Sequence, residues 1–441
     1  ADPNAPAAAP AEPKKKIVKR PPPKERGIVT DDPLPALVAD SIRLIQEAAQ
    51  RYRQIAETGG WPSLPKQRLA LGSKGPAVVA LRQRLAAEGD LDAGATSQPV
   101  FDKALQDALK QFQSRHGLAR SGVVAGSTLE ALNVSAATRA RQLENSAQRL
   151  VDRNLNLSGR YVVVNIPSAS VEAVENGSVR RRYVAVVGKP ENASPQVDAR
   201  IGTVNINPTW TVPTSIIKNE FIPKMRSNPA NNFLARSNIR ILDRSGNTVP
   251  ASSIDWSTDR AVNYTFRQDS GSTNSLGQIR IDMPNRDAVY MHDTPSKRFF
   301  NAQDRFFSHG CVRVQDVKGL AAWLLEGTAG NWDKSTIEAA ISEGERKDIR
   351  LARPVPVAWV YLTGYVTDDG KTHFRDDVYS LDTPQAMASL VARRTQRQAQ
   401  REAQQQNADF TASVPSAGSL ATGQMIDPPV SDAPRRGWLW W

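Results

Sequence analysis

The only cysteine of the 441-residue chain stands in the tetrapeptide SHGC at 308–311, directly after a glycine and two positions after a histidine. A second histidine, His292, precedes Cys311 by 19 residues. A thiolate attacks carbonyl carbon whereas a thiol barely does, so a nucleophilic cysteine needs a base, and an imidazole is the usual one. His309 is too close in sequence to be assumed as that base. His292 ends a β-branched run, and a residue at a strand end can face a loop across a site.

The backbone around the cysteine also suits carbonyl chemistry. Gly310 has no side chain and allows a tight turn. The peptide N–H groups of 309–311 could then point at a developing oxyanion. The carbonyl or the carboxylate of Asp293 could hold the tautomer of His292. These features predict a cysteine site for acyl transfer or hydrolysis.

Two other interpretations compete with a nucleophilic cysteine. A lone cysteine is more often a buried, small apolar residue. A metal centre would use His292, His309 and Cys311, but the H-x-E and C-x-x-C patterns are absent from the sequence. No metal and no organic cofactor is therefore expected. A single cysteine also excludes an intramolecular disulfide framework.

Composition limits the classes of partner. Hydrophobic residues are 40% of the chain, and Lys plus Arg exceed Asp plus Glu by 12. Much of this excess sits near the two ends, which favours solvated basic linkers over a nucleic-acid groove, so no nucleic acid is expected. The sequence has no run of about 18 apolar residues, so no transmembrane helix is expected. The start "ADPNAPAAAP" suggests a processed chain. Whether a signal or a membrane anchor precedes residue 1 stays an open question.

The pattern along the chain predicts an α+β multidomain fold. Val78, Leu81 and Leu85 recur at helical spacing, whereas "RYVVVNI" and "RRRYVAVV" are β-branched runs around the turn "ENGS". Residues 213–266 are mixed and polar, which indicates an insertion. The expected segments are a disordered Pro/Lys-rich linker (1–34), a helical N-terminal scaffold segment (35–66), a small three-helix domain (67–135), a helical connector (136–159), a mainly-β domain (160–384) and a low-complexity C-terminal tail (385–441), which ends in the tryptophan-rich "RRGWLWW".

The motif "HDT" followed by "SHGCVR" resembles the L,D-transpeptidase catalytic domain of the YkuD type. "GGWP", "VVVNIP", "NPTWTVPTSI" and "VYMHDTPSKRFF" are similar to the large periplasmic subgroup, whose segment after "NPTW" forms a mobile cap over the active site. The resemblance implies Cys311 as the nucleophile, His292 as the base, the backbone around Ser308, His309 and Gly310 as the oxyanion hole, and Arg313, Asp293 and Tyr290 beside Ser308 as substrate contacts.

The helical segment 69–133 resembles the type 1 peptidoglycan-binding domain. Its matching positions, such as Gly72, Val78, Phe112 and Gly117, are mostly core or turn positions. His116 is expected at the surface or at a helix C-cap. His373 lies in a polar hairpin and is expected to be solvated.

These resemblances imply an L,D-transpeptidase that cross-links meso-diaminopimelate residues of peptidoglycan, with release of D-Ala. Its partners would be a donor tetrapeptide stem and an acceptor stem, with cell-wall synthesis proteins as further partners and carbapenems as inhibitors. The location would be the periplasm of a Gram-negative cell. Two alternatives stay open: a cysteine L,D-carboxypeptidase or hydrolase acting on stems or on tethered proteins, and a non-enzymatic wall-binding scaffold.

Overall fold

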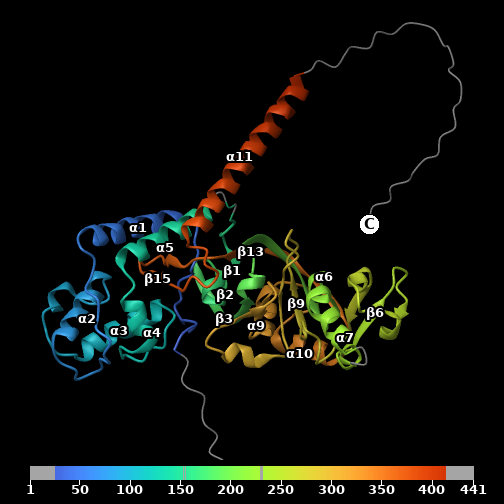
Figure 1. The fold of residues 1–441 in the computed structure, drawn as a ribbon, viewed down its shortest axis with the longest axis horizontal. Helices are drawn as coiled ribbons and strands as arrows, with labels where there is room; N and C mark the ends of the chain where they lie inside the picture. The colour runs from blue at the N-terminus through green and yellow to red at the C-terminus, as the bar shows by residue number, and fades with distance from the viewer. Residues whose placement is uncertain (1–24, 152, 154, 229–231, 414–441) are drawn as a thin grey trace, which may run out of the picture. The chain divides into compact units, whose positions relative to one another are not determined.

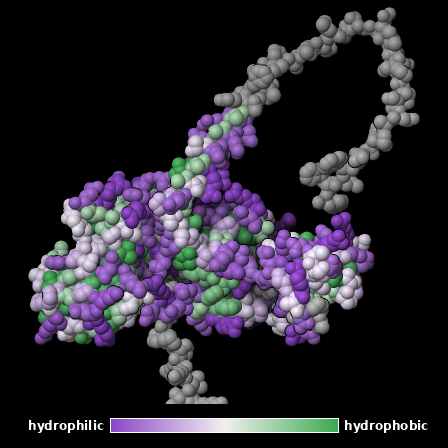
Figure 2. Space-filling view, in the orientation of Figure 1, coloured by the Kyte–Doolittle hydropathy of each residue, from purple (hydrophilic) through white to green (hydrophobic). Residues whose placement is uncertain are grey.

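The computed structural model describes residues 25–151, 153, 155–228 and 232–413. Most of the predicted 1–34 linker and the terminal tryptophan cluster lie outside these residues. The chain divides into two compact units, with the boundary between Thr383 and Pro384. Hydrophilic residues cover most of the face seen in Figure 2. No helix in the described part of the chain is long and apolar enough to cross a membrane.

A small helical domain follows the N-terminal segment. It consists of α2 (Pro76–Ala87), α3 (Lys103–Arg115) and α4 (Gly126–Leu132). The carboxylate of Asp102 caps α3 by accepting the N–H of Leu105 at 2.9 Å. The expected apolar positions form its core, which includes Val78, Leu81 and Phe112. Periodicity therefore predicted this three-helix domain correctly.

Two longer helices connect this domain to the β domain (Figure 1). Helix α1 (Ser41–Glu57) packs against α5 (Ala136–Leu150). Their apolar faces share one core with Val163 of the sheet and Phe374.

The β domain is a sheet that closes on itself. Nine strands of the described chain pair in the order β11-β3-β12-β10-β9-β4-β13-β1-β2, and β2 also pairs with β3, which closes the ring. The strands are β1 (Arg160–Asn165), β2 (Ser170–Glu175), β3 (Ser178–Gly188), β4 (Val197–Ile206), β9 (Ile279–Asp282), β10 (Met291–His292), β11 (Phe306–Ser308), β12 (Val312–Val314) and β13 (Lys347–Val360).

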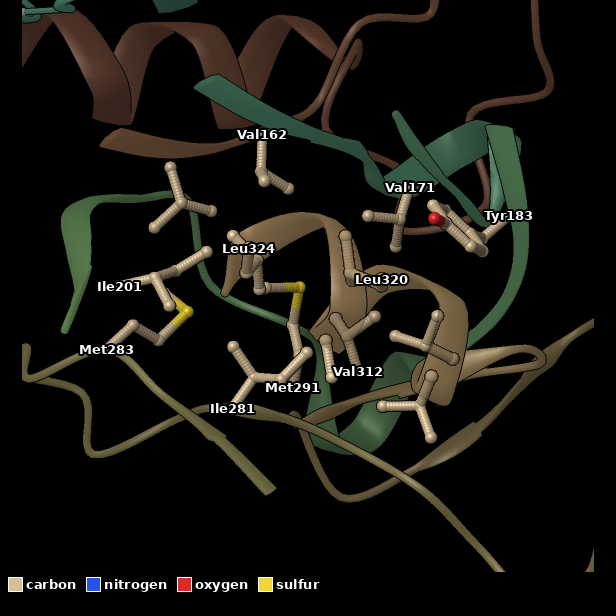
Figure 3. Close-up of a cluster of buried hydrophobic side chains, with 14 of the residues drawn as sticks. Val162, Val171, Tyr183, Ile201, Ile281, Met283, Met291, Val312, Leu320 and Leu324 are labelled. Carbon is tan, nitrogen blue, oxygen red and sulfur yellow. The ribbon is translucent and has the colours of Figure 1, made fainter. Parts of the chain in front are cut away.

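The core of this ring is apolar and includes helix α9 (Val317–Leu324), with α10 (Lys334–Ser342) beside it. Figure 3 shows Leu320 and Leu324 of α9 among Val162, Met291 and Val312 of the strands. This packing fixes the positions of β10 and β12, the two strands that carry the expected site residues.

A separate subdomain is inserted between β4 and β9. Its small sheet has the order β5-β8-β6-β7, and its own core includes Phe221, Trp256 and Phe266. Because β4 and β9 pair with each other, this cap leaves the ring and rejoins it at adjacent strands. Its elements are β5 (Trp210–Thr211), α6 (Thr214–Ile216), a π-helical turn η4 (Ile217–Phe221), α7 (Ile222–Ser227), α8 (Phe233–Arg236), β6 (Ile239–Leu242), β7 (Thr248–Val249) and β8 (Thr265–Gln268). The predicted fold class, with its cap and its helical domain, is confirmed.

The hairpin after β13 corrects one expectation. Strands β14 (Gly364–Val366) and β15 (Thr372–Phe374) form it, as the turn residues predict. His373 is buried rather than solvated, and it stacks on Tyr365 with ring centroids 4.8 Å apart. The reason is tertiary, because β15 packs against α3. His116 is the C-cap of α3, as expected, but it too is buried and not at the surface.

The start of the C-terminal tail also differs from the expectation of an unstructured end. Residues Pro384–Ser413 form helix α11. The segment is rich in Ala, Gln and Arg, which favour helices, and Gln398 hydrogen-bonds Glu402 one turn later. Low sequence complexity was therefore a poor guide to backbone structure here.

Candidate active site

Strand pairing brings the histidine and the cysteine segments together. β10 and β12 run parallel, with Met291 opposite Val312 and His292 opposite Arg313. Met291 and Val312 point into the apolar core (Figure 3). Because side chains alternate along a strand, His292 and Arg313 lie on the other face. Cys311 directly precedes β12.

His292 is held as a neutral base. Its Nδ1 donates to the carbonyl oxygen of Asp293, which assigns the ring proton to Nδ1 and leaves Nε2 as an acceptor. Burial, and then the charge of Arg313, lowers its pKa to about 3, although hydrogen bonds to the backbone of Asp293 and Leu276 act in the opposite direction. The imidazole is therefore unprotonated at neutral pH, and in the free protein it is a weak base.

Cys311 rests as a thiol. Burial raises its pKa, against hydrogen bonds from the backbone and side chain of Tyr290 and the charges of Arg280 and Arg313. The ring of Tyr290 also contacts that of His292, with centroids 5.8 Å apart. Tyr290 thus touches both halves of the cysteine–histidine pair, a closer role than the expected substrate contact. The resting pair is neutral, so attack on a carbonyl requires the thiol proton to move to a base.

Two arginines flank the histidine across the sheet. His292 of β10 lies opposite Arg280 of β9 on one side and Arg313 of β12 on the other. Within the described residues, the Nε of each guanidinium has no hydrogen-bond partner. Arg280 was not predicted from the sequence. The alternation in Ile279-Arg280-Ile281 puts it on a polar face, but only the strand register shows that this face is the one that carries His292.

The glycine of the tetrapeptide sets the loop geometry. Gly310 has a φ of +113°, a backbone conformation that disfavours other residues. Ser194 fastens this loop from outside, since its hydroxyl donates to the carbonyl of Gly310 at 2.7 Å and accepts the N–H of Gly188 at 2.9 Å. Ser194 was also missed, because nothing in "ENASPQ" suggests a partner more than a hundred residues away.

The loop's own serine changes the expected oxyanion hole. The Ser308 hydroxyl accepts the N–H of Gly310 at 3.2 Å and donates to the carbonyl of Cys311 at 2.5 Å. Gly310 therefore has no free N–H, whereas in the described part of the chain the N–H groups of His309 and Cys311 have no protein partner. Ser308 is fully buried and fastens the loop, so it is not placed as the expected substrate contact.

Asp293 is likewise turned inward. One carboxylate oxygen accepts the N–H of Gln278 at 3.1 Å, and the other pairs with Lys297. A Cβ at Gly277 would overlap this carboxyl group. The side chain of Asp293 is thus buried and bound to other groups of the protein, while the backbone carbonyl of Asp293 orients His292. The expectation of a substrate contact does not match this position.

The cap reaches the catalytic loop through a contact between Glu220 and His309. Glu220, in the π-helical turn, lies 2.5 Å from Nε2 of His309, and both side chains are partly exposed (48% and 35%). A second link runs from Trp210 of β5, whose side chain hydrogen-bonds that of Tyr290. The cap therefore contacts the loop and the tyrosine beside the thiol. No group of three or more His, Cys, Asp or Glu side chains in the described segments is arranged to hold a metal ion.

Comparison with known proteins agrees with this geometry. Residues 159–337 match the family model of the L,D-transpeptidase catalytic domain (YkuD), and residues 74–132 match that of the "Putative peptidoglycan binding domain". A "Putative L,D-transpeptidase" from Haemophilus influenzae is 31% identical over 251 residues, which are 57% of this chain and 50% of that protein. The chain thus spans about half the length of this curated relative.

Several solved structures similar to the chain are L,D-transpeptidases. The enzyme from Xylanimonas cellulosilytica is 19% identical over 68% of this chain and 99% of that chain, with a TM-score of 0.22. The enzyme from Stackebrandtia nassauensis is 14% identical over 68% and 97%, with a TM-score of 0.25. L,D-transpeptidase 3 from Mycobacterium tuberculosis, solved with a faropenem-derived adduct, is 11% identical over 46% and 60%, with a TM-score of 0.22. At such TM-scores these superpositions add nothing to the assignment, which depends on the family models and the relative.

The β ring thus carries Cys311 and His292 on or beside two paired strands, within the region that matches the catalytic-domain family. The chain thus carries a region similar to the L,D-transpeptidase catalytic domain, preceded by a region similar to peptidoglycan-binding domains. The ring extends beyond the first match, because β13 lies between β1 and β4.

Proposed function

We propose that the chain is an L,D-transpeptidase that joins two peptidoglycan stems through a thioester on Cys311. The observation that carries this proposal is a neutral imidazole, oriented by the carbonyl of Asp293, on the strand that pairs with the one directly after the cysteine. This arrangement suits proton transfer from the thiol at the moment of attack.

The first half of the reaction forms the thioester. The Cys311 proton passes to His292 as Sγ attacks the carbonyl of the bond between meso-diaminopimelate and terminal D-Ala. The N–H groups of Cys311 and His309 stabilise the oxyanion. The C–N bond then breaks, His292 returns the proton to the leaving amine, and D-Ala departs.

The second half transfers the acyl group. The side-chain amine of a second stem attacks the thioester carbonyl and gives its proton to His292. The C–S bond breaks, the imidazolium protonates the departing sulfur, and a cross-link between two diaminopimelate residues remains. The cap, in contact with the loop and Tyr290, limits access of water that would hydrolyse the thioester.

Arg280 and Arg313 supply the recognition of the donor. A guanidinium pairs well with a carboxylate, and meso-diaminopimelate carries one beside its side-chain amine. Pairing of Arg313 with the donor carboxylate would also weaken the larger of the two charges that hold the His292 pKa low, since Arg280 already pairs with Asp282. The pKa of His292 would therefore rise, and His292 would become a stronger base, once the donor stem is bound.

The test is a muropeptide assay with purified protein and tetrapeptide monomers. Wild type should yield cross-linked dimers and free D-Ala by mass spectrometry, whereas Cys311→Ala should yield neither. Trimmed monomers without dimers would favour the carboxypeptidase alternative, and unchanged monomers with retained sacculus binding would favour a scaffold. A carbapenem should add its mass to wild type and not to Cys311→Ala. The proposed setting is the Gram-negative periplasm, where these stems occur.

A further inference from the structure

A second site lies away from the thiol, where the helical domain meets the β domain. A cavity of about 220 Å³ opens there, roughly seven times the volume of a water molecule in the liquid. Its walls come from the end of α3, from α4 and α5, from the turn after β1, from the segment before β11 and from the residues after β15. None of the candidate active-site residues lines it.

Three buried arginines line this cavity. Arg139, Arg305 and Arg375 are 5%, 1% and 8% exposed. In the described part of the chain, none of them has a carboxylate within 4 Å. Buried charges in proteins are normally paired, because desolvation of an isolated ion is costly. The neighbouring arginines follow that rule, since Arg84 pairs with Glu88 and Arg115 with Asp90.

The three arginines are held in place by neutral groups instead. Arg305 donates to the carbonyls of Ala185, Ser168 and Ala169 at 3.0–3.2 Å. Arg375 donates to the carbonyls of Arg115 and Phe374 and to the hydroxyl of Tyr365. Arg139 donates to Gln142 and the carbonyl of Ala131. These contacts fix the guanidinium groups without neutralising them.

Two buried polar atoms of residues that line the cavity have no partner among the described residues, although neither atom is itself exposed to the cavity. They are Nε of Arg139 and Nε2 of His116. His116 donates from Nδ1 to the carbonyl of Phe112 at 2.8 Å, and burial keeps its pKa well below the ordinary value. Its Nε2 is therefore an acceptor. What the lining offers a ligand is therefore the positive charge of the three arginines.

The surroundings limit the charge of a ligand. Glu130, Asp304, Asp376 and Asp377 also contribute to the lining, and Arg26 pairs with Glu130 and Asp376. These carboxylates would repel a dianion more than a monoanion. We propose that the cavity binds the terminal carboxylate of a peptide, which would neutralise the buried guanidinium groups. That this peptide is a wall stem rests on the proposed function.

Titration calorimetry on the full chain tests this site. Cys311→Ala removes turnover, and N-acetyl-D-alanine supplies a carboxylate next to an amide N–H. We expect saturable binding of N-acetyl-D-alanine, no binding of the uncharged N-acetyl-D-alaninamide, and weaker binding of free D-alanine. Arg139→Gln should weaken binding by about tenfold, the effect of losing one charged hydrogen bond. Arg313→Gln, in the candidate active site, should leave it unchanged.

A second variant keeps the test conclusive if Arg139→Gln does not fold. Ala131→Leu fills the cavity from α4 without removing a charge or a hydrogen bond, and it should abolish binding while the unfolding midpoint stays near that of the parent. The proposal would be overturned by absent binding, by binding that Arg313→Gln alone removes, or by tighter binding of inorganic phosphate. Because the Cys311→Ala protein has no thiol and only equilibrium binding is measured, these outcomes are independent of whether the chain is a transpeptidase.

Discussion

At the residue scale, Arg313 joins substrate recognition to base strength. Its charge is the largest influence after burial on the low pKa of His292. We expect Arg313→Gln to raise that pKa in the free protein and to lower kcat/KM by about tenfold to a hundredfold, because a charged hydrogen bond to substrate is lost. NMR titration of His292 and steady-state kinetics check the two effects.

Arg313→Lys is the matched variant for charge. It should keep the His292 pKa low but recover only part of kcat/KM, because an ammonium cannot form the planar paired hydrogen bonds of a guanidinium. An unchanged His292 pKa in Arg313→Gln would show that burial alone sets it.

The thiol itself gives a second residue-scale prediction. Because burial raises the pKa of Cys311, its thiolate fraction in the free protein should be small at neutral pH and should still be rising above the ordinary thiol range. Iodoacetamide alkylation should therefore accelerate continuously with pH through that range. Cys311 is the only cysteine, so the label reports on it alone. A fast rate that is constant around neutral pH would instead indicate a preformed thiolate–imidazolium pair.

Local spacing predicted part of this site and could not predict the rest. The cysteine, the histidine and the orienting carbonyl of Asp293 lie in two short motifs, so their types and order made them one candidate site, and the family resemblance of these motifs favoured it over a buried cysteine or a metal centre. Arg280 and Ser194 come from distant strands and loops, and only the sheet register brings them to the loop. Ser308 and Asp293 were expected to contact substrate, yet their side chains satisfy buried backbone groups. Residue type does not reveal such an inward orientation.

At the element scale, the Glu220–His309 contact should act as a weak latch between the cap and the catalytic loop. The Glu220–His309 pair is half-exposed, and such pairs contribute about 0.2–1 kcal/mol. Glu220→Gln should therefore raise the open population of the cap by a few-fold and increase thioester hydrolysis relative to cross-linking. The ratio of trimmed to cross-linked muropeptides measures this change, and hydrogen exchange in α6 and η4 should quicken.

A control within the cap is Asp259→Asn. Asp259 pairs with Lys218 of the same subdomain, so its loss removes an ion pair without touching the catalytic loop. An equal change of product ratio in both variants would mean that general cap stability, and not the latch, governs hydrolysis.

The elements themselves show where sequence patterns suffice. Helical periodicity and β-branched runs predicted the helical domain and the strands, because each pattern reports local burial, whereas the insertion at 213–266 was predicted from its mixed, polar character. They failed where a polar-looking segment is buried by a distant one. The hairpin that carries His373 packs on α3, and nothing within "DDGKTHFRDD" encodes that contact.

At the scale of the whole molecule, three buried histidines should make the first unit sensitive to acid. Burial lowers the pKa of His116, His292 and His373 below the ordinary value of 6.5. Below that value the unfolded chain binds protons that the folded chain does not. The free energy of unfolding is therefore highest above about pH 6.5 and falls as pH decreases towards the folded-state values, by up to about 1.4 kcal/mol per pH unit for each histidine.

Urea unfolding between about pH 7.5 and pH 4.5 would measure this slope. His373→Gln removes one of the three titrating groups and can still hydrogen-bond Thr367, the partner of His373 Nε2 at 3.2 Å. Its midpoint should fall less steeply with decreasing pH than that of wild type, even if it is lower at neutral pH. Parallel slopes would mean that His373 gains its proton without unfolding of the protein. The acid sensitivity would then come from His116, which lines the cavity, and from His292, the proposed base.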